Sequence, residues 1–140
     1  MYGIKGKVTG DHRKIRDQIR KQAGAIILKH ALGMASATYA VYPVGPPHKD
    51  NTPHTRDTFQ IVKGDNTVLA EKGNFKSAKE TFEVSNDPKN RLSFLAKGAS
   101  FFLEFGTVNM DPRPIIRRMI RMAQAGITKD LRKMNLRHGR

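Results

Sequence analysis

The feature that most constrains this fold is a long helical repeat of apolar residues near the start of the sequence. Apolar side chains recur at three- and four-residue intervals from Ile15 to Met34, which places them on one face of a helix. Asp11 or Thr9 can cap its first turn. The pattern predicts a helix over 11–39, roughly 43 Å long at about 1.5 Å per residue. A compact domain of this size has a radius of gyration of about 14 Å. The helix is therefore expected to span or overhang the domain, or to bend near Gly33.

The segments on either side of this helix read as irregular. Residues 1–10 contain three glycines and show no period, which favours a flexible arm. Residues 41–58 contain four prolines, which exclude regular helix and central strand. A long connection inside one compact domain is often functional. We therefore treat 41–58 as an inter-subunit or inter-ring loop, with candidate contacts at Pro43, Pro46, Pro47, His48 and His54.

The middle of the chain, 58–96, alternates apolar and polar residues in short runs. A run around Phe59 and Ile61 leads into the glycine-containing turn 64–66, and apolar residues resume after it. This pattern predicts a β-hairpin. Residues 80–87 predict a third strand and 91–96 a possible fourth.

The last part of the chain contains an aromatic stretch followed by a second helix. We call residues 98–107 the aromatic corner, and expect its phenylalanines to lie in the core. Asp111 is a good N-cap and Pro112 suits the first helical position, so a helix is predicted over 112–134. At 140 residues the chain predicts a single α+β domain: a long N-terminal helix, a small antiparallel sheet of three or four strands with a hairpin, and a C-terminal helix packed on the sheet.

The charge of the chain narrows the classes of partner. The formal net charge is +14, and the excess lies in the first 40 and the last 30 residues, while the middle is nearly neutral. Such a surplus favours polyanions or an acidic protein partner, although a merely solubilising surface stays an alternative. The chain has no cysteine, which excludes disulfides and thiolate metal sites. No uncharged apolar stretch is long enough to predict a membrane span.

The basic residues of the two predicted helices form a candidate binding surface. Three arginines near the start of the second helix are four residues apart and share one face. Cations at a helix N-terminus oppose the helix dipole, which favours a function for them: contact with phosphate, contact with an acidic partner, or an ion pair with Glu104. The candidate DNA- or partner-facing residues are Arg13, Arg16, Arg20, Lys21, Arg113, Arg117, Arg118 and Arg121. With no recognisable DNA-reading motif, any DNA contact is expected to be independent of sequence.

No pattern indicates an enzyme or a cofactor. His48, Asp50 and His54 could ligate a metal, but their spacing matches no metal motif, so a surface or subunit contact is the preferred interpretation. His30 lies on the apolar face of the first helix and is expected to be a partly buried packing residue. The chain has neither a phosphate-binding loop nor a nucleophile elbow.

Two short motifs give the chain a resemblance to a known family. Glu104, Phe105, Gly106 and Thr107, followed by the run 113–117 (Arg-Pro-Ile-Ile-Arg), are similar to the motif of the head–tail joining proteins of long-tailed bacteriophages. These are the neck or tail-completion proteins of lambda-like siphophages. Upstream, residues 42–44 and 52–58 occupy the order of further family motifs.

The resemblance implies a structural function. It implies a virion protein that assembles into a ring of six or twelve copies, between the head connector or portal and the tail, with packaged DNA passing through the ring. The alternative, supported by charge alone, is a free-standing protein that binds nucleic acid without sequence preference. Within the motif, we predict that Glu104 is held by hydrogen bonds or by Arg113 or Arg117, because an unpaired buried charge is costly.

Overall fold

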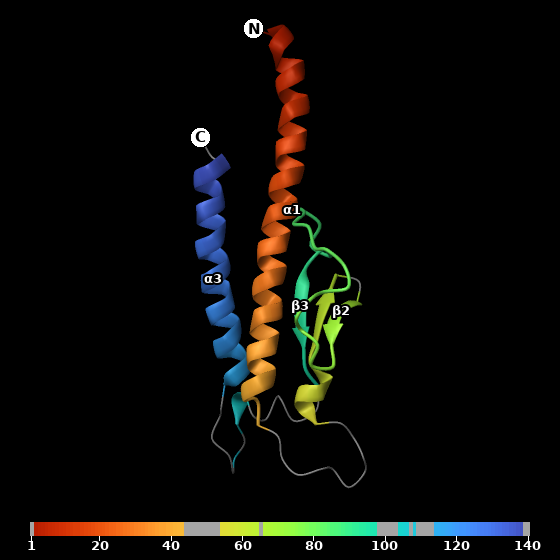
Figure 1. Ribbon diagram of the computed structural model, residues 1–140, viewed down its shortest axis with the longest axis vertical. Helices are drawn as coiled ribbons and strands as arrows, with labels where there is room; N and C mark the ends of the chain where they lie inside the picture. The colour runs from red at the N-terminus through yellow and green to blue at the C-terminus, as the bar shows by residue number, and fades with distance from the viewer. Residues whose placement is uncertain are drawn as a thin grey trace.

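The computed structural model of the chain describes residues 2–43, 54–64, 66–97, 104–106, 108 and 114–138. Within these ranges the side chains are described from His12 to Met134. The elements in chain order are α1 (Tyr2–Val41), the 3₁₀ turn η1 (Thr55–Thr58), β1 (Gln60–Lys63), β2 (Thr67–Glu71), β3 (Leu92–Leu95) and α3 (Ile115–His138). Figure 1 shows α1 as a central rod, with α3 along one side and the sheet on the other.

Helix α1 is longer than the sequence predicts. It runs without interruption through 40 residues, about 60 Å at 1.5 Å per residue, and Figure 1 shows its first turns projecting beyond both α3 and the sheet. The prediction of a flexible arm over 1–10 is wrong for residues 2–10, which are helical. The glycines there lower helix propensity by about 1 kcal/mol each, but they do not prevent an existing helix from extending, because each added residue gains one hydrogen bond.

The predicted hairpin is confirmed. Strands β1 and β2 pair antiparallel with a bulge between Ile61 and Val62. Their connection uses left-handed backbone at Gly64 (φ 34°) and Asn66 (φ 71°), residue types that tolerate it best. The possible fourth strand over 91–96 is also present, as β3, which pairs antiparallel with the other edge of β1. The sheet order is therefore β2-β1-β3.

The strand predicted over 80–87 does not form. This segment crosses α1 instead of joining the sheet: the Val84 amide donates to the Arg20 carbonyl at 3.3 Å, and Phe82 is buried. The crossing is possible because Gly24 has no side chain. A Cβ there would overlap the Phe82 carbonyl oxygen.

The core lies between α1 and the sheet. Phe59, Ile61 and Leu69 of the sheet region are fully buried, and the closely packed face of α1 supplies Ala35 and Thr38, which are equally buried. The Thr38 hydroxyl donates to the Met34 carbonyl at 2.7 Å, so the buried polar group is satisfied within its own helix.

Helix α3 begins at Ile115 rather than at residue 112. The proposed cap and first position, Asp111 and Pro112, lie outside the described residues. Pro114 fills the N-cap position, because its carbonyl accepts from the Arg118 amide at 3.3 Å. Helix α3 runs antiparallel to α1, and a groove of about 180 Å³ separates it from β1 and β3. The predicted α+β architecture is thus confirmed, with α3 packed chiefly along α1.

Candidate functional site

The most organised polar site among the described residues is the buried carboxylate of Glu104. Its side chain is 7% exposed, and it lies at the N-terminus of α3. One carboxylate oxygen accepts from the Ile116 amide at 2.6 Å, and the other from the Arg117 amide at 3.2 Å. These amides belong to the first turn and have no partner within the helix. Glu104 therefore caps α3 from a separate segment, a function that the Pro114 side chain cannot supply.

Arg117 closes this site from outside. Its Nε lies 3.3 Å from a Glu104 carboxylate oxygen, and its Nη2 donates to the Glu104 carbonyl at 2.7 Å. The guanidinium also lies over the Phe105 ring, 4.5 Å from the centroid. The prediction that Glu104 is held by hydrogen bonds or an arginine is confirmed, and Arg117 is that arginine. The positive charge of Arg117 is therefore paired with Glu104 within the chain.

Tyr42 connects this cap to the hydrophobic core. It is buried and packs edge-to-face on Phe59, with ring centroids 5.0 Å apart. Burial, and secondarily the negative charge of Glu104, raise the pKa of the Tyr42 hydroxyl. That hydroxyl has no hydrogen-bond partner among the described residues. Tyr42, at the end of α1, thus lies between Phe59 in the core and the Glu104 cap at the start of α3.

The rest of the aromatic corner is only partly described. Phe105 is 54% exposed, so the expectation that it lies in the core is wrong. Its ring instead supports Arg117. Gly106 adopts a φ of 78°, the left-handed backbone that glycine accepts without strain. Thr107 and the expected core residues at 101–103 lie outside the described residues.

The predicted basic cluster divides into two groups on different parts of the molecule. Arg117, Arg118 and Arg121 lie near the start of α3, next to the end of α1. Since the two helices are antiparallel (Figure 1), the basic residues of α1 lie toward the opposite end. There Arg13, Arg16 and Lys21 are exposed and Arg20 is half-buried. Arg113 lies outside the described residues.

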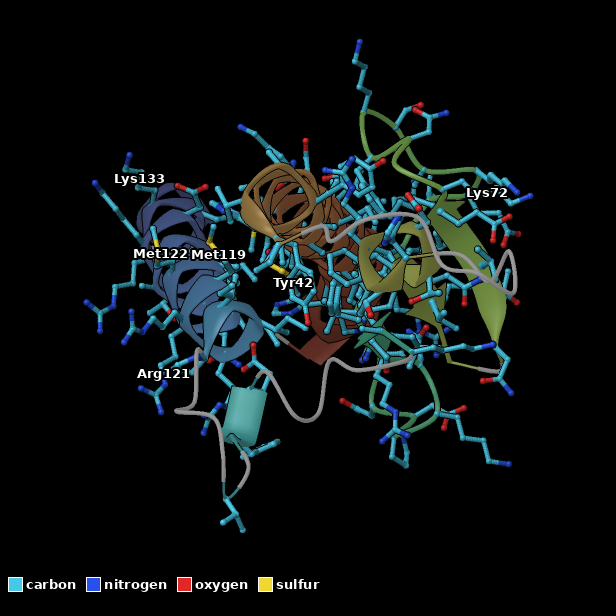
Figure 2. The ribbon with its side chains drawn as sticks, turned by 90° about the horizontal axis from the view of Figure 1, so that it is seen from below. Tyr42, Lys72, Met119, Arg121, Met122 and Lys133 are labelled. Atoms are coloured by element: carbon cyan, nitrogen blue, oxygen red, sulfur yellow. The ribbon has the colours of Figure 1, made fainter. Side chains whose placement is uncertain are left out.

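The sequence analysis missed three further basic residues of α3. Lys129, Arg132 and Lys133 are exposed on the same helix, and Figure 2 shows Arg121 and Lys133 pointing away from α1. The sequence does contain a signal for these residues, namely their position around the helix. At about 100° per residue these positions share one side of the helix with Arg118 and Arg121.

A polar pair joins the two helices in the C-terminal half of α1. His30 Nε2 lies 2.7 Å from a carboxylate oxygen of Asp130. The hydrogen bond from His30, together with the nearby Lys133 and Lys29 charges, holds the pKa of Asp130 below its ordinary value. Gly126 makes room for the imidazole, because a Cβ there would lie 2.7 Å from it. His30 is partly buried as predicted, but its partner lies 100 residues away and could not be identified from spacing.

The proline-rich loop is mostly outside the described residues, which include neither Pro46, Pro47, His48 nor Asp50. Pro43 is exposed, and His54 immediately precedes η1. Among the described residues, no group of three or more histidines or carboxylates is placed to hold a metal ion. Among the helices that the structure describes, none combines the length and the apolar character that crossing a membrane requires.

The Glu104 cap and the basic side of α3 are therefore the two features with functional potential. The cap is structural, since every one of its contacts satisfies a helix terminus or fixes Arg117. The basic side is open to solvent. Comparison of the chain with protein-family models, with curated proteins and with solved structures gives no match.

Proposed function

We propose that the chain is a ring-forming structural subunit of the neck of a long-tailed bacteriophage, joining the head connector to the tail. The observation that carries this proposal is the length of α1. Figure 1 shows the first turns of this helix projecting beyond α3 and the sheet, and a backbone hydrogen bond joins the helix to the segment 80–87 at Arg20. The side chains of residues 12–18 are all exposed.

A helical segment of this kind is suited to packing against a partner. Helices in proteins are stabilised mainly by packing of an apolar face, and the described side chains of this segment are exposed. Ile15 leaves 48% of its surface exposed on a segment that its own domain does not cover. A neighbouring copy in a ring would supply the missing contact, because head-to-tail association closes into a ring when the rotation between copies permits.

The corner supports the same proposal. The described residues of the corner motif lie close together. Glu104 and Arg117 contact one another directly, and Gly106 makes the turn beside them. The motif thus corresponds to one physical unit, a capped and charge-paired helix start. In the proposed ring of six or twelve copies, packaged DNA would pass through the lumen without sequence-specific contacts.

The test is the mass of the purified protein by native mass spectrometry, with negative-stain images of the same sample. We expect a closed oligomer. Ile15→Asn should shift the mass toward the monomer, whereas the matched variant Ile15→Leu should assemble normally. A wild-type protein that stays monomeric alone and with connector or tail particles, and is dispensable for joining heads to tails, would refute the proposal.

The second candidate is a free-standing nucleic-acid-binding protein, favoured by the basic side of α3. It predicts that the isolated subunit binds naked duplex DNA with strong salt dependence. Arg118→Glu with Arg121→Glu is the informative variant. Arg117 is unsuitable for this test because its replacement also removes the partner of Glu104. Absence of duplex binding at low salt eliminates this candidate.

A further inference from the structure

The charged side chains on the solvent side of α3 are all positive. We define the outer face of α3 as its exposed residues on an arc of about 160° at 100° per residue. They are Arg117, Arg118, Arg121, Met122, Ala125, Thr128, Lys129, Arg132 and Lys133. This face has six cations and no carboxylate, because the single acid of the helix, Asp130, turns toward His30. The outer face therefore attracts negatively charged partners of any kind.

Apolar side chains are exposed among these cations at the N-terminal end of the face. Met122 is 69% exposed, and Figure 2 shows it on the side of α3 away from α1, whereas Met119 lies toward α1. Arg118 lies one turn before Met122 on the same side of the helix, and the exposed ring of Phe105 lies under the Arg117 guanidinium at the start of the helix. Exposed Met, Phe and Arg together are the residue types enriched at protein interfaces.

The three arginines at this end of the outer face differ in the contacts that they make within the chain. Arg117 is already paired with Glu104 and fixed over the Phe105 ring, so it contributes a rigid planar surface. Arg118 and Arg121 form no ion pair with any residue that the structure describes. Within the described part of the chain, they are the arginines at this end whose charges have no carboxylate partner.

We propose that Phe105, Arg118, Arg121 and Met122 form a docking surface for an acidic protein segment that also carries apolar side chains. Carboxylates of the segment pair with the two arginines, while its apolar groups cover Met122 and the edge of Phe105. Duplex DNA would satisfy the cations but presents mainly phosphates and sugars to such a surface, leaving Met122 uncovered. The inference rests on the proposed function, in which this face meets a neighbouring virion protein and not the packaged DNA.

Binding of three labelled probes by fluorescence anisotropy tests the docking surface on the full-length protein. Two are peptides of about twelve residues with equal negative charge, one alternating Glu with Leu and the other Glu with Ser; the third is a short DNA duplex. We expect the Glu/Leu peptide to bind about tenfold more tightly than the Glu/Ser peptide, a difference of about 1.4 kcal/mol. The duplex should bind more weakly than the Glu/Leu peptide at physiological salt.

Three variants locate the effect. Met122→Ser should remove the preference for the Glu/Leu peptide, Arg121→Gln should weaken both peptides, and Arg132→Gln, at the far end of the same face, should leave the preference unchanged. Equal binding of the two peptides, tighter binding of the duplex, no measurable binding of either peptide, or an unchanged preference in Met122→Ser would each overturn the inference. The native mass of the same samples reports the ring separately, so failure of the docking surface and failure of the proposed function are distinguishable.

Discussion

At the level of single residues, Glu104 caps the N-terminus of α3 although it lies outside that helix. The first turn of a helix leaves amide groups without partners, and Pro114, at the N-cap, has no side chain able to accept from them. The carboxylate accepts hydrogen bonds from two of these amides. Its negative charge is also stabilised by the positive end of the helix dipole. The buried negative charge is therefore compensated by two backbone amides and by the Arg117 guanidinium.

Replacing Glu104 should consequently destabilise the whole domain. We expect Glu104→Ala to lower the free energy of unfolding by about 2 kcal/mol, from the lost cap and the unsatisfied buried amides. The measurement is urea unfolding at constant m-value. The control Glu83→Ala removes an exposed carboxylate and should change the stability by less than about 0.5 kcal/mol. Equal stability of the two variants would show that the cap contributes nothing.

The sequence permits this prediction only in part. A lone acid among phenylalanines predicts that Glu104 is buried and paired, because burial of a bare charge is too costly. It does not predict that Phe105 faces outward. Apolar character alone cannot distinguish a ring that fills the core from one that supports a guanidinium, since both are favourable.

At the level of elements, the clearest difference between sequence and structure is the segment 80–87. Its alternation suits a strand, but the backbone of Phe82 and Val84 runs against α1. A pattern of period two records only that alternate side chains are buried, and the surface that buries them can be a sheet or a helix. The long helix and the hairpin, by contrast, depend on local periodicity and turn residues, and both are confirmed.

Two glycines of α1 provide a matched test of this crossing. Gly24→Ala places a methyl group against the Phe82 carbonyl, so we expect a loss of about 2 kcal/mol or more. Gly33→Ala meets nothing within 4 Å, and should instead stabilise the helix by roughly 0.5–1 kcal/mol. Thermal unfolding monitored by circular dichroism measures both. Similar shifts in the same direction for the two variants would contradict the backbone crossing at Gly24.

At the level of the whole molecule, the His30–Asp130 pair is a side-chain link between two helices that are far apart in the sequence. Because the pKa of Asp130 is lowered in the folded protein, its ionised form stabilises the fold. This contribution is complete above the ordinary pKa of an aspartate and is lost as the pH falls through the lowered value.

Asp130→Asn should therefore be less stable than the wild type at neutral pH, and the difference should shrink as the pH is lowered below about 4. Thermal unfolding of both proteins across this pH range measures the effect. Lys129→Asn, next to Asp130 but exposed on the outer face, is the control, and its difference from wild type should not follow this profile. A stability difference for Asp130→Asn that persists to the lowest pH would show that the ionised carboxylate is not responsible.

The acid-free outer face of α3 also restricts the symmetry of any assembly. A two-fold contact between the α3 outer faces of two copies would place six cations against six others, and like charges at a contact disfavour it. This face is therefore unsuited to a back-to-back dimer, in which each copy offers the same patch to its partner. Two copies that meet through the outer face must use different surfaces, the outer face of one copy against a less basic surface of the other. Such head-to-tail contacts give the assembly a direction.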